Sequence, residues 1–338
     1  MRKQHLTIAG AALSVAGVAI AFGGLSAAVV GTSSDQAEGQ APASAQPRDR
    51  GTNRVALSPV VSRGAVSFKD RSIPVRADVT SVGTSRGGLV ITETDNGLGN
   101  VVHVHDTDGD PVIEADAVKG IAISDPAGTR AAWVEYTSRS DEGGSQVVTV
   151  DVASGRILGR APVAELARVT AVSGRDVAMS DGDQSFLWSP EAGLTRLTFV
   201  PDDYYVVALD AERVVASDLN STTTIFTRSG SRTGNPSGLI SWDLNGAGRL
   251  VGATEDGSLK VIDPGSGTTT TTLRPPFHAV SASWTSEGTV VATSRAALTG
   301  TGHGYAWCTL SNECSALLNG GTPYAPNDAV GQLVAQSR

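Results

Sequence analysis

The chain is poor in aromatic residues, sulfur and lysine. Of its 338 residues 5% are aromatic and 18% are charged, and it has only two Cys and two Met. Its four lysines are Lys3, Lys69, Lys119 and Lys260. The formal net charge is −8. Because binding to nucleic-acid phosphates requires clustered Lys and Arg, this composition argues against a nucleic-acid partner, and we expect none. Abundant Ala and Gly with so little Lys indicate a bacterial gene of high GC content.

Helical periodicity and catalytic motifs are also missing. No long amphipathic helical pattern follows residue 60, which argues against an α/β fold. The chain has no Gly-x-Ser-x-Gly elbow and no phosphate-binding loop, and nothing singles out a nucleophile, a base and an acid. We therefore expect a protein that is not an enzyme, with no cofactor and no metal site. The 39 glycines, together with many Val, Thr, Ala and Ser residues, suit short strands joined by tight turns.

The longest apolar run lies at the N-terminus. Arg2 and Lys3 precede the uncharged residues 6–31. This run exceeds the roughly 20 residues that span a bilayer as a helix, and the ~7–15 apolar residues of a cleavable signal. Because the positive charges precede the run, we expect residues 1–5 in the cytoplasm, residues 6–31 as a transmembrane anchor and the rest of the chain outside.

A cleaved signal peptide is the alternative to the anchor. Its apolar part would end near Phe22, where Gly23 and Gly24 break the helix, and residues 26–28 would form the small-residue cleavage site. No Cys closely follows the run, which excludes a lipid-modified cysteine there. The protein is then either a single-pass protein of the cell membrane with its domain outside, or a secreted one.

Residues 32–58 are rich in Ala, Pro, Ser, Gln and Gly. Such a segment cannot bury enough apolar surface to offset the entropy lost on ordering. We expect a flexible linker here, followed by a folded domain over residues 59–334.

A recurring phrase predicts the fold of that domain. Three apolar stretches follow one another, separated first by a polar turn with Gly and then by a charged or Gly-containing turn, most clearly over residues 243–273. Looser versions begin near Ser81, Ile121, Val169, Val206 and Val280. Recurrence at about 35–50 residues indicates an array of four-stranded units. We therefore expect an all-β fold, a β-propeller of six or seven four-stranded blades, preceded by a hydrophobic helix and a disordered linker.

The first residues of the domain indicate how the ring of propeller blades closes. Ala65–Phe68 and Arg71–Val75 look like a hairpin around Lys69 and Asp70. This hairpin either begins a blade or supplies the strand that closes the ring. Strands contributed by both ends of the chain would remove the open sheet edges.

Two segments carry a family resemblance. Residues 124–133, SDPAGTRAAW, are similar to the Ser-Pro-Asp-Gly phrase and following apolar residues of TolB-like propellers, with Asp and Pro exchanged and Ala127 additional. Residues 248–263 resemble a WD40-type blade, with Ile262 and Asp263 where that family has Trp-Asp, although its Gly-His opening is missing. The chain thus resembles WD40/TolB-like β-propeller proteins of the bacterial cell envelope over about residues 80–318, which implies a fold rather than an activity.

The two cysteines, Cys308 and Cys314, predict a disulfide. Facing each other across a hairpin, they would enclose a three-residue loop, 310–312, whose last residue, Asn312, tolerates the left-handed conformation required there. Opposed residues lie ~4.5–5.5 Å apart, within disulfide reach, and export favours oxidation. Two free thiols are the alternative. Two sulfurs without further Cys or His nearby do not complete a tetrahedral metal site.

Residues 105–110, HDTDGD, have the clustered carboxylates of a calcium loop. An EF-hand requires Glu at the twelfth position, but counting from Asp106 that position holds Ala117. Because Asp and Gly also form tight turns, we expect a turn. His103 and His105 share one strand face but have no identifiable third ligand, so they predict no metal site.

The loops that enter the innermost strand of each blade offer a candidate binding site. In propellers these loops lie on one face, around the central channel. Here they combine aromatic and acidic residues, which are suited to recognition when exposed. The candidate residues are Asp202, Asp203, Tyr204, Tyr205, Phe277 and His278. The alternative is that the aromatic members pack between blades, as we expect of the five tryptophans, Trp133, Trp188, Trp242, Trp284 and Trp307.

Together these features predict a non-enzymatic, exported propeller that binds a protein, a peptide or a cell-envelope component through its loop face. The alternative is a secreted propeller enzyme, a hydrolase, lyase or cyclase acting on sugars or peptides. It would require convergent carboxylate or His groups around the channel. A propeller that serves only as a spacer or an assembly subunit is the third possibility.

Overall fold

The computed structural model describes eleven segments between residues 60 and 323. They are 60–62, 65–68, 71–94, 99–125, 128–137, 144–218, 222–244, 248–284, 288–294, 305–316 and 322–323. All belong to one compact unit, residues 49–338, whereas the other unit, residues 1–48, lies wholly outside them. The predicted anchor, 6–31, and the predicted linker, 32–58, also lie outside the described residues. None of the described segments contains a helix long and apolar enough to cross a bilayer.

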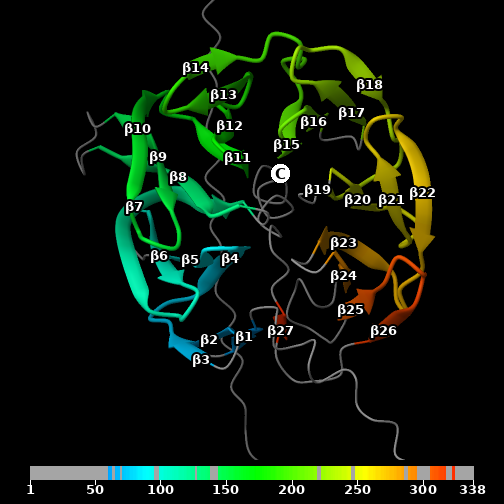
Figure 1. Ribbon diagram of the computed structural model, residues 1–338, viewed down its shortest axis with the longest axis horizontal. Helices are drawn as coiled ribbons and strands as arrows, with labels where there is room; N and C mark the ends of the chain where they lie inside the picture. The colour runs from blue at the N-terminus through cyan, green and yellow to red at the C-terminus, as the bar shows by residue number, and fades with distance from the viewer. Residues whose placement is uncertain are drawn as a thin grey trace, which may run out of the picture. The chain divides into compact units, whose positions relative to one another are not determined.

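All regular secondary structure in these segments is β-strand, and all paired strands are antiparallel, which confirms the all-β expectation (Figure 1). The first sheet has the order β27-β1-β2-β3, with β1 Val60–Ser62, β2 Ala65–Phe68, β3 Arg71–Pro74 and β27 Thr322–Pro323. A seven-stranded sheet contains β4 Val79–Ser85, β5 Gly88–Thr94, β6 Asn100–Asp106, β7 Pro111–Ser124, β8 Arg130–Tyr136, β9 Ser145–Asp151 and β10 Ile157–Val163.

Four further sheets each contain four consecutive strands. The first two comprise β11 Arg168–Ser173, β12 Asp176–Ser180, β13 Ser185–Ser189, β14 Gly193–Arg196, β15 Tyr205–Leu209, β16 Arg213–Ser217, β17 Thr223–Thr227 and β18 Arg232–Gly234. The last two comprise β19 Asp243–Leu244, β20 Leu250–Ala253, β21 Leu259–Asp263, β22 Thr268–Leu273, β23 Ala279–Trp284, β24 Val290–Ser294, β25 Tyr305–Cys308 and β26 Cys314–Ala316.

The long strand β7 belongs to two groups of four strands. Its first half, up to Val118, pairs with β6, and its second half, from Val118 to Ser124, pairs with β8. Within this second half, the pairing with β8 shifts register between Lys119 and Ile123. The described strands therefore form seven antiparallel quartets, which we number in chain order: the first is β27 with β1–β3, the second β4–β7, the third β7–β10, and the fourth to seventh are the four-stranded sheets from β11 onward.

The first quartet takes strands from both ends of the domain. Val60 pairs with Pro323 and Val61 with Thr322, so that β27 lies antiparallel to β1. The hairpin expected at residues 65–75 is present as β2 and β3, with Ala65 opposite Pro74 and Phe68 opposite Arg71. A strand from one end of the domain thus covers the edge that β1 would otherwise leave open.

The same turn joins the third and fourth strands of six quartets. A side-chain oxygen of the residue that ends or follows the third strand accepts a backbone N–H from the turn, and a residue with positive φ comes three or four positions later. The acceptors are Asp106, Asp151, Ser189, Thr227, Asp263 and Thr309. The positive-φ residues are Gly109, Gly155, Gly193, Gly230, Gly267 and Asn312. Because Gly adopts positive φ without steric cost, this turn explains much of the recurring phrase in the sequence.

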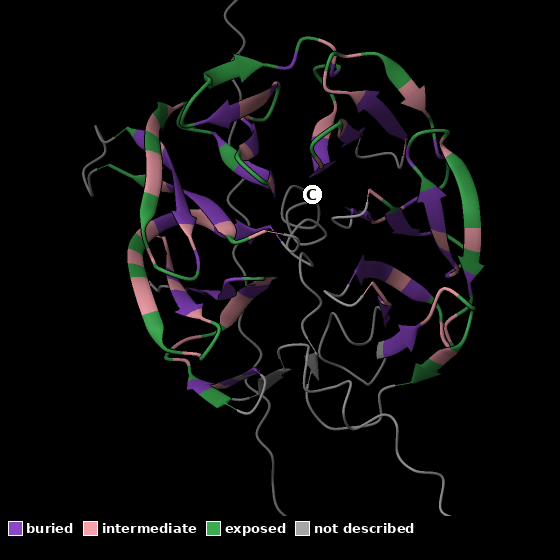
Figure 2. Ribbon diagram, viewed as in Figure 1, coloured by how far each residue is buried: buried purple, intermediate pink, exposed green. Residues whose placement is uncertain are grey.

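Hydrophobic cores lie between consecutive quartets. Six clusters of buried side chains each take residues from two quartets that follow one another in the chain, from the first and second to the sixth and seventh. All five tryptophans are buried, as expected. Figure 2 shows the burial falling from the first strands of the later quartets to the last, and the four residues of β14 are all exposed.

The disulfide prediction is confirmed. Cys308 and Cys314 are bonded, oppose each other in the β25–β26 pair, and have Cα atoms 4.1 Å apart. Thr309 donates its N–H to the carbonyl of Glu313 at 3.0 Å, which leaves the predicted three-residue loop. Asn312 has a φ of 65°, the left-handed conformation expected at its last position.

Reducing this disulfide should lower the free energy of unfolding by about 2 kcal/mol, because so short a loop restricts the unfolded chain only modestly. Guanidinium unfolding of the full-length protein with and without a reductant measures the change. A variant with Cys308→Ala and Cys314→Ala is the control, and its unfolding midpoint should not respond to the reductant. An equal response in both proteins would contradict the assignment.

Candidate functional site

The first predicted site loop connects β14 to β15. Asp202 and Asp203 are exposed. Arg196, which ends β14, donates to the carboxylate of Asp202 at 2.9 Å and forms an ion pair with it. Tyr204 is half-buried and packs against the core between the fourth and fifth quartets. The acidic members of this loop thus face solvent while the first tyrosine faces the protein.

Tyr205 links this loop to a neighbouring one. It begins β15, is half-buried, and packs against the core between the fifth and sixth quartets. Its hydroxyl donates to the carbonyl of Gly182 at 3.2 Å. Gly182 belongs to the loop between β12 and β13, which also carries Asp181 and Asp183. Asp181 accepts the N–H of Gln184 at 2.9 Å, which holds that loop in shape.

The second predicted loop connects β22 to β23 and makes a similar contact. Phe277 is half-buried and packs against the core between the sixth and seventh quartets, whereas His278 is exposed. His278 lies over Gly257, where an added Cβ would come within 2.6 Å of the imidazole Nδ1. Ala279 donates its N–H to the carbonyl of Gly257 at 3.2 Å. Gly257 is part of the loop between β20 and β21, which carries Glu255 and Asp256.

Three hydrogen bonds favour the charged form of Asp256. The hydroxyls of Thr254 and Ser258, and the backbone N–H of Ser258, donate to its carboxylate and hold the pKa of Asp256 well below its usual range. Hydrogen bonds to the charged form favour that form even at an exposed position. This carboxylate is therefore a fixed negative charge at the surface.

The structure does not bring the six predicted site residues into one pocket, because their aromatic members pack in different cores. It does place acidic loops beside them. We define the acidic loop row as residues 181–184, 201–204, 254–258 and 274–278. The row contains one arginine, Arg274, and the carboxylates Asp181, Asp183, Asp202, Asp203, Glu255 and Asp256. In an antiparallel quartet the loop after the second strand and the loop after the fourth strand lie at the same end. Residues 181–184 accordingly lie beside the loop that ends at Tyr204, and residues 254–258 lie beside the loop that ends at His278.

Sequence reasoning found Asp202 and Asp203 but missed four of these carboxylates. Asp181 and Asp183 follow the second strand of the fourth quartet, and Glu255 and Asp256 follow the second strand of the sixth. The signal that identifies them is topological. Once the strands are assigned to quartets, the loops after β12 and β20 are found beside the loops that enter the next quartets.

The segment 105–110 forms the turn between β6 and β7, as expected. The carboxylate of Asp106 accepts the N–H groups of Asp108 and Asp110 at 2.9 and 3.0 Å. His103 lies between two carboxylates, with its Nε2 3.5 Å from Glu93 and its Nδ1 3.5 Å from Glu114. Within the described segments, no group of three His, Cys, Asp or Glu side chains is arranged to hold a metal ion.

His105 should make the protein less stable in acid. Burial lowers the pKa of His105 below its ordinary value of 6.5, although its Nδ1 contacts the carbonyl of Gly109 at 3.1 Å. The folded state therefore favours neutral His105, and this contribution is present above pH 6.5 and is lost as the pH falls through the lowered pKa. Urea unfolding between pH 7.5 and pH 5 should show a smaller acid loss in His105→Gln than in the unmodified protein. Parallel curves of unfolding free energy against pH for the two proteins would contradict this role of His105.

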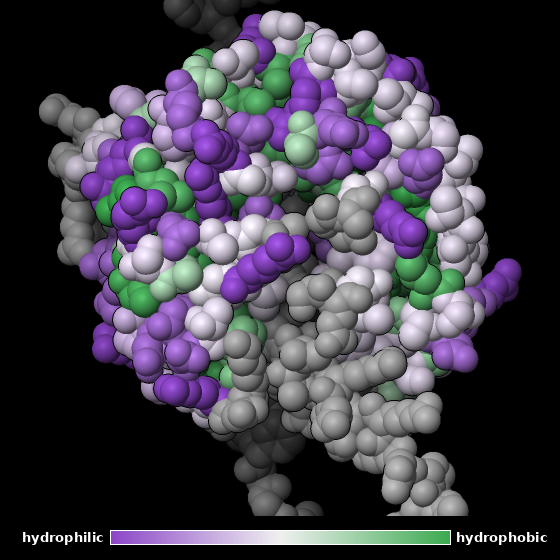
Figure 3. Space-filling model, in the orientation of Figure 1, coloured by the Kyte–Doolittle hydropathy of each residue, from purple (hydrophilic) through white to green (hydrophobic). Residues whose placement is uncertain are grey.

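Exposed apolar surface is scattered rather than gathered. The large hydrophobic residues that are exposed among the described segments are Tyr136, Ile157, Leu166 and Leu194. They come from β8, β10, the loop before β11, and β14. Figure 3 shows hydrophobic groups interspersed among hydrophilic ones on the visible face. Single exposed apolar residues are usual on soluble domains, so these do not form a docking surface.

A small hollow lies among the inner strands of four quartets. It is lined by residues of β7, β11 and β15 and by Trp242, Asp243 and Leu244 at β19. The centre of a water molecule can move through about 30 Å³ of it. That space holds about two water molecules.

Two buried carboxylates near these inner strands hold neighbouring quartets together. Asp125, which follows β7, accepts the N–H of Gly174 at 2.7 Å. Asp243 accepts the N–H of Trp284 at 2.6 Å. Each bond joins the inner strand of one quartet to that of the next. The role that the geometry gives these carboxylates is therefore structural.

No protein-family model matches the chain, and its sequence matches no curated protein.

Proposed function

We propose that the seven quartets are the blades of a β-propeller of the WD40/TolB-like kind, closed by the pairing of β27 with β1. Three observations support this architecture. The quartets are antiparallel and follow chain order, hydrophobic cores join each quartet to the next, and the first quartet contains strands from both ends of the domain. Closure by two chain ends is a way to remove exposed sheet edges.

We propose that this propeller is a non-enzymatic binding module of the cell envelope, and that it binds a positively charged protein or peptide through the acidic loop row. The observation that carries the proposal is six carboxylates against one arginine in four loops that lie at the same end of their quartets. Like charges gathered on one surface attract a partner of opposite charge and speed its association. Tyr204, Tyr205 and Phe277 support these loops from beneath, because they are packed into the cores.

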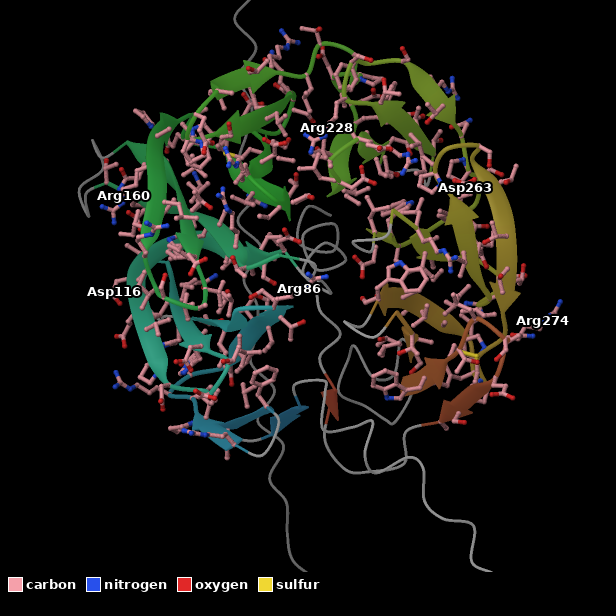
Figure 4. All side chains as sticks on the ribbon, viewed as in Figure 1. Arg86, Asp116, Arg160, Arg228, Asp263 and Arg274 are labelled. Carbon is pink, nitrogen blue, oxygen red and sulfur yellow. A yellow bond between two sulfur atoms is a disulfide. The ribbon has the colours of Figure 1, made fainter. Side chains whose placement is uncertain are left out.

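A charge-neutralising variant tests the acidic loop row. Asp183→Asn, Asp203→Asn and Glu255→Gln remove three exposed charges that accept no hydrogen bond among those described above. Asp108→Asn, Asp116→Asn and Glu313→Gln remove the same number of exposed charges elsewhere and form the matched control. Asp116 lies on the outer side of its sheet (Figure 4). Both variants leave the residues of the hydrophobic cores unchanged.

A fluorescent octalysine peptide serves as the probe, with binding to the full-length protein measured by anisotropy at low and moderate salt. We expect the row variant to weaken binding about tenfold at low salt, because each lost charge removes a modest attraction that salt screens. The control should weaken it less than about threefold. Equal weakening by both variants would show that the peptide responds to net charge alone and would overturn the proposed site.

We also propose that the domain is exported and held at the membrane by residues 6–31. The basic residues before that run and the disulfide of the seventh quartet support export, because disulfides persist in oxidising compartments. N-terminal sequencing of the mature protein distinguishes the two forms. A chain that begins at or next to Met1 supports the anchor, whereas one that begins near Val29 supports the secreted form.

A further inference from the structure

The outer strand of the sixth quartet, β22, differs from its equivalents in the other quartets. An outer strand leaves a row of backbone N–H and C=O groups unpaired, and native proteins protect such edges with charged side chains, with proline or by keeping the strand very short. Charged or proline residues are present in β3 (Arg71, Pro74), in the first half of β7 (Glu114, Asp116), in β10 (Arg160, Pro162), in β14 (Arg196) and in β18 (Arg232). The outer strand of the seventh quartet, β26, has only three residues.

By contrast, β22 is six residues long and consists of five threonines followed by Leu273, with no charged residue and no proline. Leu273 is buried and Thr271 is half-buried, whereas the other four residues are exposed. Figure 2 shows this exposure along most of the strand. Because the β-branched side chain of threonine favours the extended conformation, β22 presents an exposed edge that is well suited to pair with a further strand.

The one protective feature of β22 is a β-bulge. Its pairing with β21 shifts register between Val261 and Ile262, which leaves Thr270 as the extra residue. Register shifts also occur in the pairs β9–β10 and β17–β18, but the outer strands of those pairs carry an arginine as well. Within the described segments, the edge of β22 is therefore less protected than the edges of the outer strands that are of similar length or shorter and carry a charge.

The charges that flank β22 have opposite signs at its two ends. Asp263 is exposed and lies opposite Thr268, the first residue of the strand. Arg274 is exposed and follows the last residue. Figure 4 shows these two labelled side chains at opposite ends of the strand. If two copies of β22 pair antiparallel, Asp263 of each copy comes toward Arg274 of the other, whereas a parallel pair places like charges beside each other. This complementarity favours a second copy of the chain as the partner.

We propose that β22 is a self-association edge, through which two copies of this chain pair antiparallel and join their sixth quartets into one continuous sheet. The two-fold axis passes through Thr270, so each threonine of one strand lies opposite a threonine of the other. Such cross-strand pairs stabilise a sheet, and a symmetric contact of one surface with itself is the commonest arrangement in homo-oligomers. The proposal does not depend on the acidic loop row, because the row variant with three neutralised carboxylates should associate like the unmodified protein.

Charge placed on the edge tests the contact. The variant with Thr269→Lys and Arg274→Glu brings two lysines close together across the axis and replaces the attraction at the strand ends with repulsion. The matched control, Thr195→Lys with Arg232→Glu, makes the same change in net charge at exposed positions of the outer strands β14 and β18.

Sedimentation equilibrium of the full-length protein in a zwitterionic detergent at low salt measures the dimer dissociation constant. We expect the edge variant to raise this constant about tenfold and the control to raise it less than about twofold. A protein that remains monomeric at every concentration would overturn the proposal. Equal weakening by both variants, or no weakening by either, would place the contact elsewhere in the chain and would overturn it as well.

Distances between spin labels supply a second readout that identifies the strand and its direction. Both native cysteines are in the disulfide, so a nitroxide reacts only with an introduced cysteine. Labels on Thr268→Cys and on Thr272→Cys should be about equally far apart between the two copies, and labels on Ser266→Cys should be farther apart, because antiparallel strands diverge in register from the axis. Equal separations at all three positions would indicate parallel strands, and the absence of short separations would exclude β22 from the contact; either result would contradict the proposal.

Discussion

Replacing Trp284 with alanine should lower the free energy of unfolding by about 4 kcal/mol. Trp284 ends β23, is 1% exposed, and packs in the core between the sixth and seventh quartets with residues such as Val251 and Leu259. Its removal loses buried apolar surface and leaves a cavity that the antiparallel sheets on either side cannot readily fill. Guanidinium unfolding followed by circular dichroism measures the loss.

Conservative substitution separates the packing of a tryptophan from its hydrogen bond. The indole N–H of Trp284 is buried with no partner among the described residues, whereas that of Trp242 donates to Thr223 Oγ1 at 2.5 Å. Trp242→Phe leaves the buried Thr223 hydroxyl without its donor, so it should cost about 1 kcal/mol more than Trp284→Phe. A smaller loss in Trp242→Phe than in Trp284→Phe would contradict this account of the two side chains.

Local patterns in the sequence predicted the recurring four-stranded units because each quartet alternates apolar runs with turns that need specific residues. The turn at Asp263–Gly267 shows the reason, since a side-chain acceptor and a glycine with positive φ are visible in the sequence itself. Length and register were harder to predict. Nothing in residues 119–123 indicates that β7 continues from one quartet into the next, and the two residues of β27 are a strand only because β1 lies beside them.

The candidate site was predicted only in part, for a physical reason. Asp202 and Asp203 lie beside tyrosines in the sequence, so a local pattern reveals them. Glu255 and Asp256 reach the same row through the antiparallel order of their quartet, which no local pattern contains.

The carboxylate of Asp243 should be the most sensitive polar group between quartets. It is 5% exposed and accepts the backbone N–H of Trp284 at 2.6 Å. Asp243→Ala leaves that buried N–H without its acceptor, and a hydrogen bond to a charged group is stronger than a neutral one. The free energy of unfolding should therefore fall by about 3 kcal/mol. Thermal and guanidinium unfolding of the full-length protein measure it.

Asp125→Ala is the matched control because it removes the same kind of hydrogen bond, from a backbone N–H to a carboxylate, at a position that water can reach. Asp125 accepts the N–H of Gly174, which is exposed, so water can replace the lost carboxylate there and the cost should be only about 1 kcal/mol. Asp243→Asn should also cost about 1 kcal/mol, since its amide oxygen can still accept the N–H of Trp284. The difference between the two alanine variants follows from where water can reach the unpaired N–H. If Asp125→Ala destabilised the protein as much as Asp243→Ala, the cost would lie in the removal of charge and not in the unpaired N–H group.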